Sequence, residues 1–226
     1  MNTTFAIAGT AGRKEDANRL SANHFKAMME CARLLLQQFK ESDYGVDTLV
    51  SGGAAWADHV AVKLFLNKEI PKLKLFFPCQ FLGQVAGFDP TPLNEHERQY
   101  GYSTGETANR LHAAFSRKCG FNSLGDLENA VQQGAIVVVP SGGFHGRNAK
   151  VAEADILLAM TFGDHEWVKA SVSKKTGKPV GTAHTVTVYL NRVKKFGFFD
   201  KSFHYDLNSG EIFAGARVRS SEATNS

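Results

Sequence analysis

The sequence has few cysteines, no long hydrophobic run and no strong excess of charge of either sign. Its three cysteines, Cys31, Cys79 and Cys119, lie far apart and outside any CxxC pair, which argues against a disulfide framework or a structural zinc site. No apolar run approaches the roughly 20 residues that span a bilayer. The first residues also lack the basic and apolar segments of a signal peptide. We therefore expect a cytoplasmic protein without a bound metal and without a membrane partner.

The charge balance is only weakly positive. The sequence holds 26 Lys and Arg against 22 Asp and Glu, a formal net charge of +4. A surplus this small suits an anionic ligand, but it does not by itself indicate nucleic-acid binding. The sequence shows no internal repeat or low-complexity segment. A chain of 226 residues can bury the core of one large α/β domain with an insertion.

Short apolar runs alternate with amphipathic segments over the first 80 residues. Runs at residues 4–8, 47–53 and 73–78 have the length and composition of buried strands. Between them, residues 25–39 and 55–66 carry apolar side chains at helical spacing. Because parallel strands need a crossover, which a helix usually supplies, this alternation predicts βαβ units and a parallel sheet.

The alternation stops at residue 79 and resumes at about residue 133. The segment between contains turn signals and two short predicted helices. The second of these starts with Ser123 and Asp126 at the spacing of a capping box. Further strands are predicted at 135–140, 155–163 and within 196–207. We predict a Rossmann-like α/β domain over residues 1–218, a parallel sheet flanked by helices with a mainly helical insertion at about 79–133, and a flexible tail at 219–226.

Four loops rich in small residues border these strands and helices: GTAGR at 9–13, SGGAAWAD at 51–58, GFHGRN at 143–148 and GTAHT at 181–185. The carboxyl ends of parallel strands meet at one edge of a sheet, where open α/β proteins bind ligands. Glycine lets the backbone approach an anion, and the N–H groups of a helix N-terminus point at it. We therefore expect a pocket for an anionic ligand where the loops meet.

Each loop also has a purely structural interpretation. A glycine after a strand is often only a turn. Arg13 is then a solvated surface charge, Asp58 caps or pairs near the start of a helix, and Trp56 packs in the core. Thr182 and Thr185 cap the helix that follows them. The combination of the four loops favours a ligand site, whereas any single loop would not.

The four segments together resemble the SLOG superfamily of Rossmann-like proteins. The stretches concerned are AGTAGR, LVSGGAAWADHVAV, GFHGRNAKVAEADILLAMTFG and KPVGTAHTV. This superfamily includes the DNA-processing protein DprA, the LONELY GUY phosphoribohydrolases and sensor domains of bacterial defence systems. The spacing SGG-x-x-x-AD followed by RN-x-x-x-x-x-AD is most similar to its small bacterial and phage nucleotide-binding branch. The resemblance covers the sheet scaffold and leaves the insertion unexplained.

The resemblance implies a protein that binds a nucleotide, including a nucleotide second messenger, or a NAD-derived small molecule. It would sense or sequester this ligand without catalysis and without a cofactor. The loops would hold phosphate or ribose through Gly9, Thr10, Arg13, Ser51, Gly52, Gly53, Asp58, Gly146, Arg147, Asn148, Gly181, Thr182 and Thr185.

The insertion carries cations and aromatic rings that suit a base and phosphates, if they reach the pocket. These are Arg98, Tyr100, Tyr102 and Arg110. Their alternative role is in a helical cap or an oligomer contact. Because small α/β units that expose apolar helices commonly associate, we expect a homo-oligomer.

Two other functions remain open. LONELY GUY enzymes carry PGG-x-GT-x-x-E, whose glutamate serves cleavage of the N-glycosidic bond of nucleoside 5'-monophosphates. The present chain resembles this motif in GTAHT but has Thr185 in place of the glutamate and no PGG before it. A threonine does not replace the carboxylate that such cleavage uses, so a hydrolase or transferase would rely on Asp58, Glu95, Glu97 or Glu106. The modest charge argues against the third possibility, DprA-like binding of single-stranded DNA.

Overall fold

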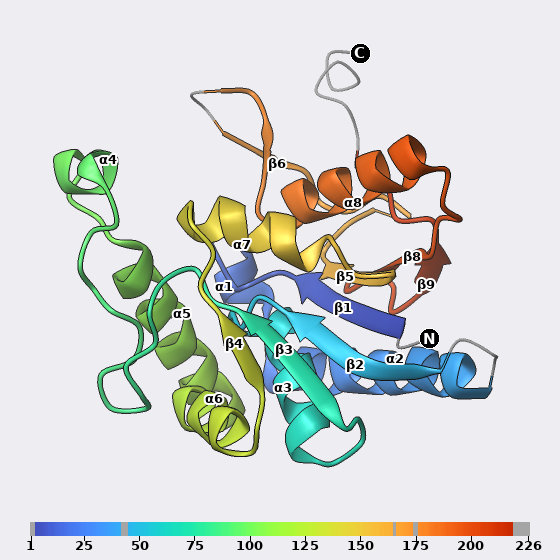
Figure 1. The fold of residues 1–226 in the computed structure, drawn as a ribbon, viewed down its shortest axis with the longest axis horizontal. Helices are drawn as coiled ribbons and strands as arrows, with labels where there is room; N and C mark the ends of the chain where they lie inside the picture. Colours follow the sequence, from blue (N-terminus) through green and yellow to red (C-terminus); the bar gives the residue numbers. More distant parts are fainter. Residues whose placement is uncertain (1–2, 42–44, 165, 174–175, 219–226) are drawn as a thin grey trace.

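The computed structural model describes residues 3–41, 45–164, 166–173 and 176–218 (Figure 1). The predicted tail at 219–226 lies outside the described residues. The strands are β1 (Thr3–Gly9), β2 (Val46–Ser51), β3 (Lys72–Phe76), β4 (Ile136–Val138), β5 (Ile156–Thr161), β6 (Ser171–Val172), β7 (Pro179–Val180), β8 (Ser202–Asp206) and β9 (Ile212–Ala214). The helices are α1 (Asp16–Arg19), α2 (Ala22–Glu41), α3 (Ala57–Leu66), α4 (Glu95–Gln99), α5 (Thr104–Cys119), α6 (Ser123–Gln132), α7 (Gly143–Val151) and α8 (Thr182–Phe196).

Seven strands form one sheet in the order β4-β3-β2-β1-β5-β8-β9. All neighbouring pairs are parallel except β8 and β9, which are antiparallel. The chain moves outward from β1 through β2, β3 and β4, and then returns to the other side of β1 with β5. The predicted Rossmann-like α/β class is therefore confirmed. The strand order reverses beside β1. In folds of this class ligands bind at such a point, so we expect a ligand at the carboxyl ends of the central strands.

Helices cover both faces of this sheet. Along β1, Phe5 and Ile7 belong to the core under α2, α3, α5 and α6, whereas Ala6 and Ala8 belong to the core under α7 and α8. Successive side chains of a strand point to opposite faces, so a strand buried on both sides is apolar throughout. The apolar runs of the sequence reflect this three-layer arrangement, which is visible in Figure 1.

The segment between β3 and β4 is the crossover between two parallel strands. It contains three helices instead of the predicted two, and α5 is 16 residues long instead of short. The predicted cap of α6 is also wrong by one residue. The Asn122 side chain accepts a hydrogen bond from the Gly125 N–H at 3.0 Å, because Asn is as good a cap as Ser and Ser123 is buried against His112.

The carboxyl-terminal elements differ from the prediction in two ways. The strand expected within 196–207 is β8, which starts at Ser202 because α8 continues to Phe196 and ends at Gly197 in the left-handed conformation. The short strands β6, β7 and β9 were not predicted, since two or three residues carry no periodic pattern.

A buried histidine ties the crossover to the glycine loop after β2. His112 of α5 lies with Nε2 at 3.1 Å from the Gly53 carbonyl oxygen and Nδ1 at 3.0 Å from the Ser123 hydroxyl. A carbonyl can only accept, so Nε2 donates to it and Nδ1 accepts from Ser123. Burial lowers the pKa of His112 to about 3, and nearby His59 adds to this effect. The ring is therefore neutral over the physiological range.

This histidine makes the stability of the fold depend on pH. An unfolded histidine has a pKa of about 6.5, so below that pH the unfolded chain binds a proton that folded His112 does not. Its stabilising effect is complete above pH 6.5 and declines as the pH falls towards 3, by about 2 kcal/mol between pH 7 and pH 5. We predict that His112→Gln, which keeps a donor for Gly53 but does not titrate, shows a shallower decline in urea unfolding followed by circular dichroism. Equal declines in the two proteins would contradict this assignment.

Candidate functional site

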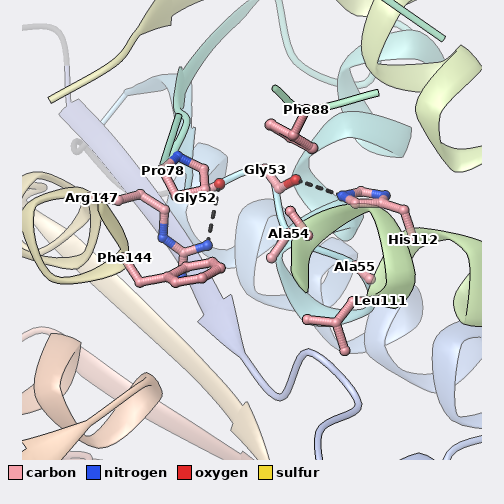
Figure 2. A pocket seen from close by; sticks show the side chains of 11 residues that line it. Gly52, Gly53, Ala54, Ala55, Pro78, Phe88, Leu111, His112, Phe144 and Arg147 are labelled. Atoms are coloured by element: carbon pink, nitrogen blue, oxygen red, sulfur yellow. Dashed lines mark hydrogen bonds between the residues drawn. The ribbon is translucent and has the colours of Figure 1, made fainter. Parts of the chain in front are cut away.

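A small pocket opens at the carboxyl edge of the sheet, between the loop after β2, Pro78 after β3, α5 and α7. Its empty volume is about 230 Å³ when the open solvent at its mouth is counted. The loop after β2 forms one side, α5 provides a second through Leu111, and α7 provides a third through Phe144 and Arg147 (Figure 2). Of the four sequence-predicted loops, SGGAAWAD and GFHGRN line the pocket, whereas GTAGR and GTAHT contact α7 through Arg13 and Gly181.

The start of α7 differs from the prediction. The helix begins at Gly143, after Gly142 in the left-handed conformation, so Gly146, Arg147 and Asn148 lie inside it and not in a loop before it. A Cβ atom at Gly146 would lie 1.8 Å from the carbonyl oxygen of Ser141. The glycine therefore allows α7 to pack against the turn that precedes it.

Arg147 lies at the centre of the loop contacts. Its Nη1 is 3.2 Å from Asp58 Oδ2 and donates to the Gly52 carbonyl oxygen at 3.3 Å. Its Nε and Nη2 donate to Asn148 Oδ1 at 3.0 and 2.7 Å. The side chains of Arg147 and Asp58 are only 11% and 3% exposed. Most of the guanidinium donors are thus used inside the protein, and the arginine holds α7 to the β2 loop and α3.

The two glycines of the β2 loop are required for different reasons. A Cβ atom at Gly52 would lie 2.5 Å from Arg147 Cζ, so the guanidinium occupies the space that a side chain would fill. Gly53 has a φ of +64°, and a Cβ there would lie 2.4 Å from the ring of Phe77. The first glycine gives room to the arginine, and the second gives the loop its turn.

Ser51 and Asp58 stabilise the same loop. The Ser51 hydroxyl donates to the Asp58 carbonyl oxygen at 2.8 Å and accepts from the Gly53 N–H at 3.3 Å. Asp58 Oδ2 accepts from the Ala54 N–H at 3.3 Å. Burial raises the pKa of Asp58, and the charge of Arg147 opposes that shift. Both side chains are directed to the protein interior, so their structural interpretation is the better one.

The first two residues of the β1 loop also have structural roles. A Cβ atom at Gly9 would lie 2.2 Å from the Met160 carbonyl oxygen and 2.5 Å from Ala57 Cβ, so the glycine permits close packing of β1, β5 and α3. The buried Thr10 hydroxyl donates to Asp16 at 2.6 Å. These contacts explain both residues without a ligand. Trp56 is likewise a core residue, 2% exposed.

Arg13, in the loop after β1, is an exposed residue. Its Cζ lies 4.5 Å from the centre of the Phe144 ring. Protein atoms nevertheless surround the guanidinium closely, and this desolvation, with the positive charges of Arg147 and Arg110, lowers the pKa of Arg13 to about 10, while Asp58 opposes the shift. Three guanidinium groups from α5, α7 and the β1 loop therefore lie close enough to affect one another, and their combined field disfavours a further positive charge. Of the three, Arg147 lines the pocket.

Asn148 joins α7 to the start of α8. Its Nδ2 donates to the Gly181 carbonyl oxygen at 3.1 Å. Gly181 precedes α8 with a φ of +60°. The N–H of Thr185 donates to the same carbonyl at 3.2 Å, and its buried hydroxyl does so at 3.5 Å. Thr185 is thus engaged within its own helix, whereas Thr182, the first residue of α8, is half-buried.

The insertion residues separate into two groups. Arg110 on α5 is near enough to Arg13 to affect its pKa. Arg98, Tyr100 and Tyr102 instead belong to α4 and the turn after it, which projects at one end of the molecule (Figure 1). All three are exposed, and none of them lines the pocket.

Glu97, one of the candidate catalytic carboxylates, holds the α4 segment in shape. Its Oε1 accepts from the Thr104 hydroxyl at 2.6 Å, and its Oε2 accepts from the backbone N–H groups of Leu93 and Thr104. A carboxylate with these donors is occupied by the loop that it closes. The side chain is therefore explained by local structure.

Sequence reasoning missed the apolar side of the pocket. Phe144 is part of the GFHGRN stretch, and an aromatic residue between glycines beside a cation was an available signal. Leu111 and His112 carry no local signal, because a helical pattern does not tell which neighbour each side chain contacts. Among the described residues, no group of three or more His, Cys, Asp or Glu side chains could hold a metal ion. No described helix is long and apolar enough to cross a membrane.

The buried ion pair gives a stability prediction. Asp58→Ala leaves the Arg147 guanidinium buried without its counter-charge, which costs about 3–5 kcal/mol. Asp47→Ala is the matched control, since Asp47 pairs with the exposed Lys72 at 2.6 Å and surface pairs contribute below about 1 kcal/mol. Urea unfolding of both variants measures the difference. A loss for Asp58→Ala no larger than that of the control would show that the pair does not hold the loops.

Comparison with known proteins gives one relative. No protein-family model matches the chain. It is 34% identical over 159 residues to an uncharacterized protein of Acanthamoeba polyphaga mimivirus, and the matched region covers 70% of this chain and 81% of the viral protein. The chain therefore belongs to the same protein family as this mimivirus protein.

Proposed function

We propose that the pocket between the β2 loop, α5 and α7 binds a nucleotide or a NAD-derived small molecule through the phosphates of that ligand and holds the ligand without cleaving it. The observation that carries this proposal is that Arg13, Arg110 and Arg147 lie close enough for their charges to interact, with Arg147 in the lining of the pocket. Asp58, which favours the charged form of Arg13, is itself paired with Arg147. A phosphate would supply the negative charge that the cluster lacks, through charge-assisted hydrogen bonds.

Other groups around the pocket suit the phosphates and the base or ribose of such a ligand. The first turn of α7 carries backbone N–H groups that have no partner within the helix, and such groups bind phosphate oxygens. Phe144 and Leu111 line the same pocket and offer apolar surface to a base or a ribose ring. Cationic and apolar surfaces side by side are what a nucleotide requires, whereas an inorganic anion needs only the first.

Two of the four carboxylates considered for catalysis, Asp58 and Glu97, support holding over cleavage, and the other two, Glu95 and Glu106, are exposed and do not line the pocket. Asp58 is 3% exposed and paired with Arg147, and Glu97 closes the α4 segment. Thr185 stands where the LONELY GUY motif that the sequence resembles has a glutamate, and its hydroxyl donates to the Gly181 carbonyl oxygen. Cleavage of a glycosidic bond uses a carboxylate that can reach the sugar. Sensing or sequestration of the ligand, and the role in phage or bacterial defence that the sequence resemblance implies, would each require binding of this kind.

The proposal is tested by ligand recovery. The protein is incubated with nucleoside monophosphates, NAD, ADP-ribose and cyclic nucleotides, separated from free ligand, denatured, and the released molecule is identified by mass spectrometry. We expect one of these molecules to return intact. Release of a free base with ribose phosphate would instead establish the N-glycosidase function. Retention of single-stranded DNA at physiological salt in a mobility assay would favour the DprA-like function.

The arginine cluster is tested by calorimetric titration with the recovered ligand. Arg13→Ala and Arg110→Ala should each weaken binding by about 1.5–3 kcal/mol, as expected for loss of a hydrogen bond to a charged group. Arg33→Ala is the matched control, because it removes the same charge far from the carboxyl ends of the strands. Arg33 pairs with Glu69, which lies just before the amino end of β3. Affinities of all three variants equal to that of the wild type would place the ligand outside this pocket.

A further inference from the structure

The strand β4 forms one edge of the sheet, and its first two residues are exposed while Val138 is partly buried. Among the described residues it pairs with β3 alone. Its neighbouring apolar side chains Ile136, Val137 and Val139 are 61%, 37% and 49% exposed. An uncovered strand edge of this kind presents backbone groups that are ready to pair with another chain.

The backbone of Val137 points away from the sheet. The Val138 carbonyl oxygen accepts from the Phe77 N–H at 2.9 Å, so Val138 directs its backbone groups to the β3 side. Successive residues of a strand direct these groups to opposite sides, because the ladder bonds of an edge strand come from alternate residues. The N–H and carbonyl of Val137 therefore lie on the outer edge of β4.

The chemistry of this edge offers nothing that would prevent pairing. Residues 134–144, with the sequence GAIVVVPSGGF, contain no charged side chain. Natural edge strands are usually protected by lysines, by a proline or a bulge within the strand, or by a covering element. The proline here, Pro140, comes after the strand. An edge that is uncharged, apolar and regular is one that another strand covers.

We propose that this other strand is β4 of a second copy of the chain, paired antiparallel across a twofold axis through Val137. Around such an axis the two Val137 residues exchange both N–H···O bonds, so the strand is complementary to itself. Because the edge carries no charge, it does not repel its own copy and gives a charged partner nothing to recognise. The two seven-stranded sheets then continue into one.

The helices beside the strand extend the contact. A specific dimer buries about 1,200 Å² or more in total, which is more than one short strand supplies. Val131, in the last turn of α6 just before β4, is 39% exposed and adds apolar surface. The helix α7 follows β4 directly, so the two candidate ligand pockets would lie on either side of the same axis. The interface itself does not depend on ligand binding.

Sedimentation equilibrium of the full chain over a range of concentrations tests the proposal. The wild type should have twice the chain mass of 24.7 kDa. Val137→Pro removes only an outward N–H and leaves the bonds to β3, as edge strands tolerate, while Val137→Lys places like charges beside the axis. Each should weaken dimerisation by roughly tenfold or more, with the circular dichroism spectrum unchanged. If the proline variant is misfolded, the lysine variant decides.

The matched control is Phe199→Lys, which puts the same charge on an apolar side chain that is 89% exposed, just before β8 near the opposite edge of the sheet. This variant should remain dimeric. A wild-type chain that is monomeric at all concentrations overturns the proposal, as does a dimer that survives both Val137 changes. Dissociation by Phe199→Lys would show that the copies associate through the other edge.

Discussion

The candidate site depends on the buried ion pair between Arg147 and Asp58. Two charges removed from water are stable only when hydrogen bonds satisfy their remaining donors and acceptors. Here the Gly52 carbonyl and Asn148 accept from the guanidinium, and the Ala54 N–H donates to the carboxylate. The requirement therefore extends from the pair to the loop after β2 and to α7. Gly52 is small because the guanidinium lies against its backbone, whereas Gly53 and Gly146 accommodate Phe77 and the Ser141 carbonyl.

Because of these internal bonds, Arg147 differs from Arg13 and Arg110 in how it can contribute to a ligand site. Arg147 contributes a positive charge to the pocket, but its donors are mostly used within the protein. Arg13 and Arg110 are exposed residues, so under the proposed function they would contact a phosphate more readily than Arg147. Arg147 instead holds the loop after β2 to α7. Burial of the guanidinium, together with the charges of Arg147 and Arg110, lowers the pKa of Arg13.

The sequence predicted the parallel sheet because β1, β2, β3 and β5 are apolar runs separated by amphipathic segments, and burial on both faces leaves that pattern directly. It did not predict that α7 starts at Gly143, because glycines favour turns and the packing that stabilises the helix is distant in sequence. It located the loops of the site but not the roles of Thr10, Ser51 and Thr185. Short polar side chains bond to whichever nearby group the fold presents, and sequence spacing does not define that group.

The crossover between β3 and β4 contributes residues to the pocket in addition to those of the loops at the end of the sheet. On α5, Leu111 lines the pocket, Arg110 adds charge beside Arg13, and His112 holds the Gly53 carbonyl. Three consecutive residues of one helix thus supply an apolar wall, a cation and a loop contact. Changes in this helix would alter the shape and charge of the pocket while the ion pair of Arg147 and Asp58 stayed in place.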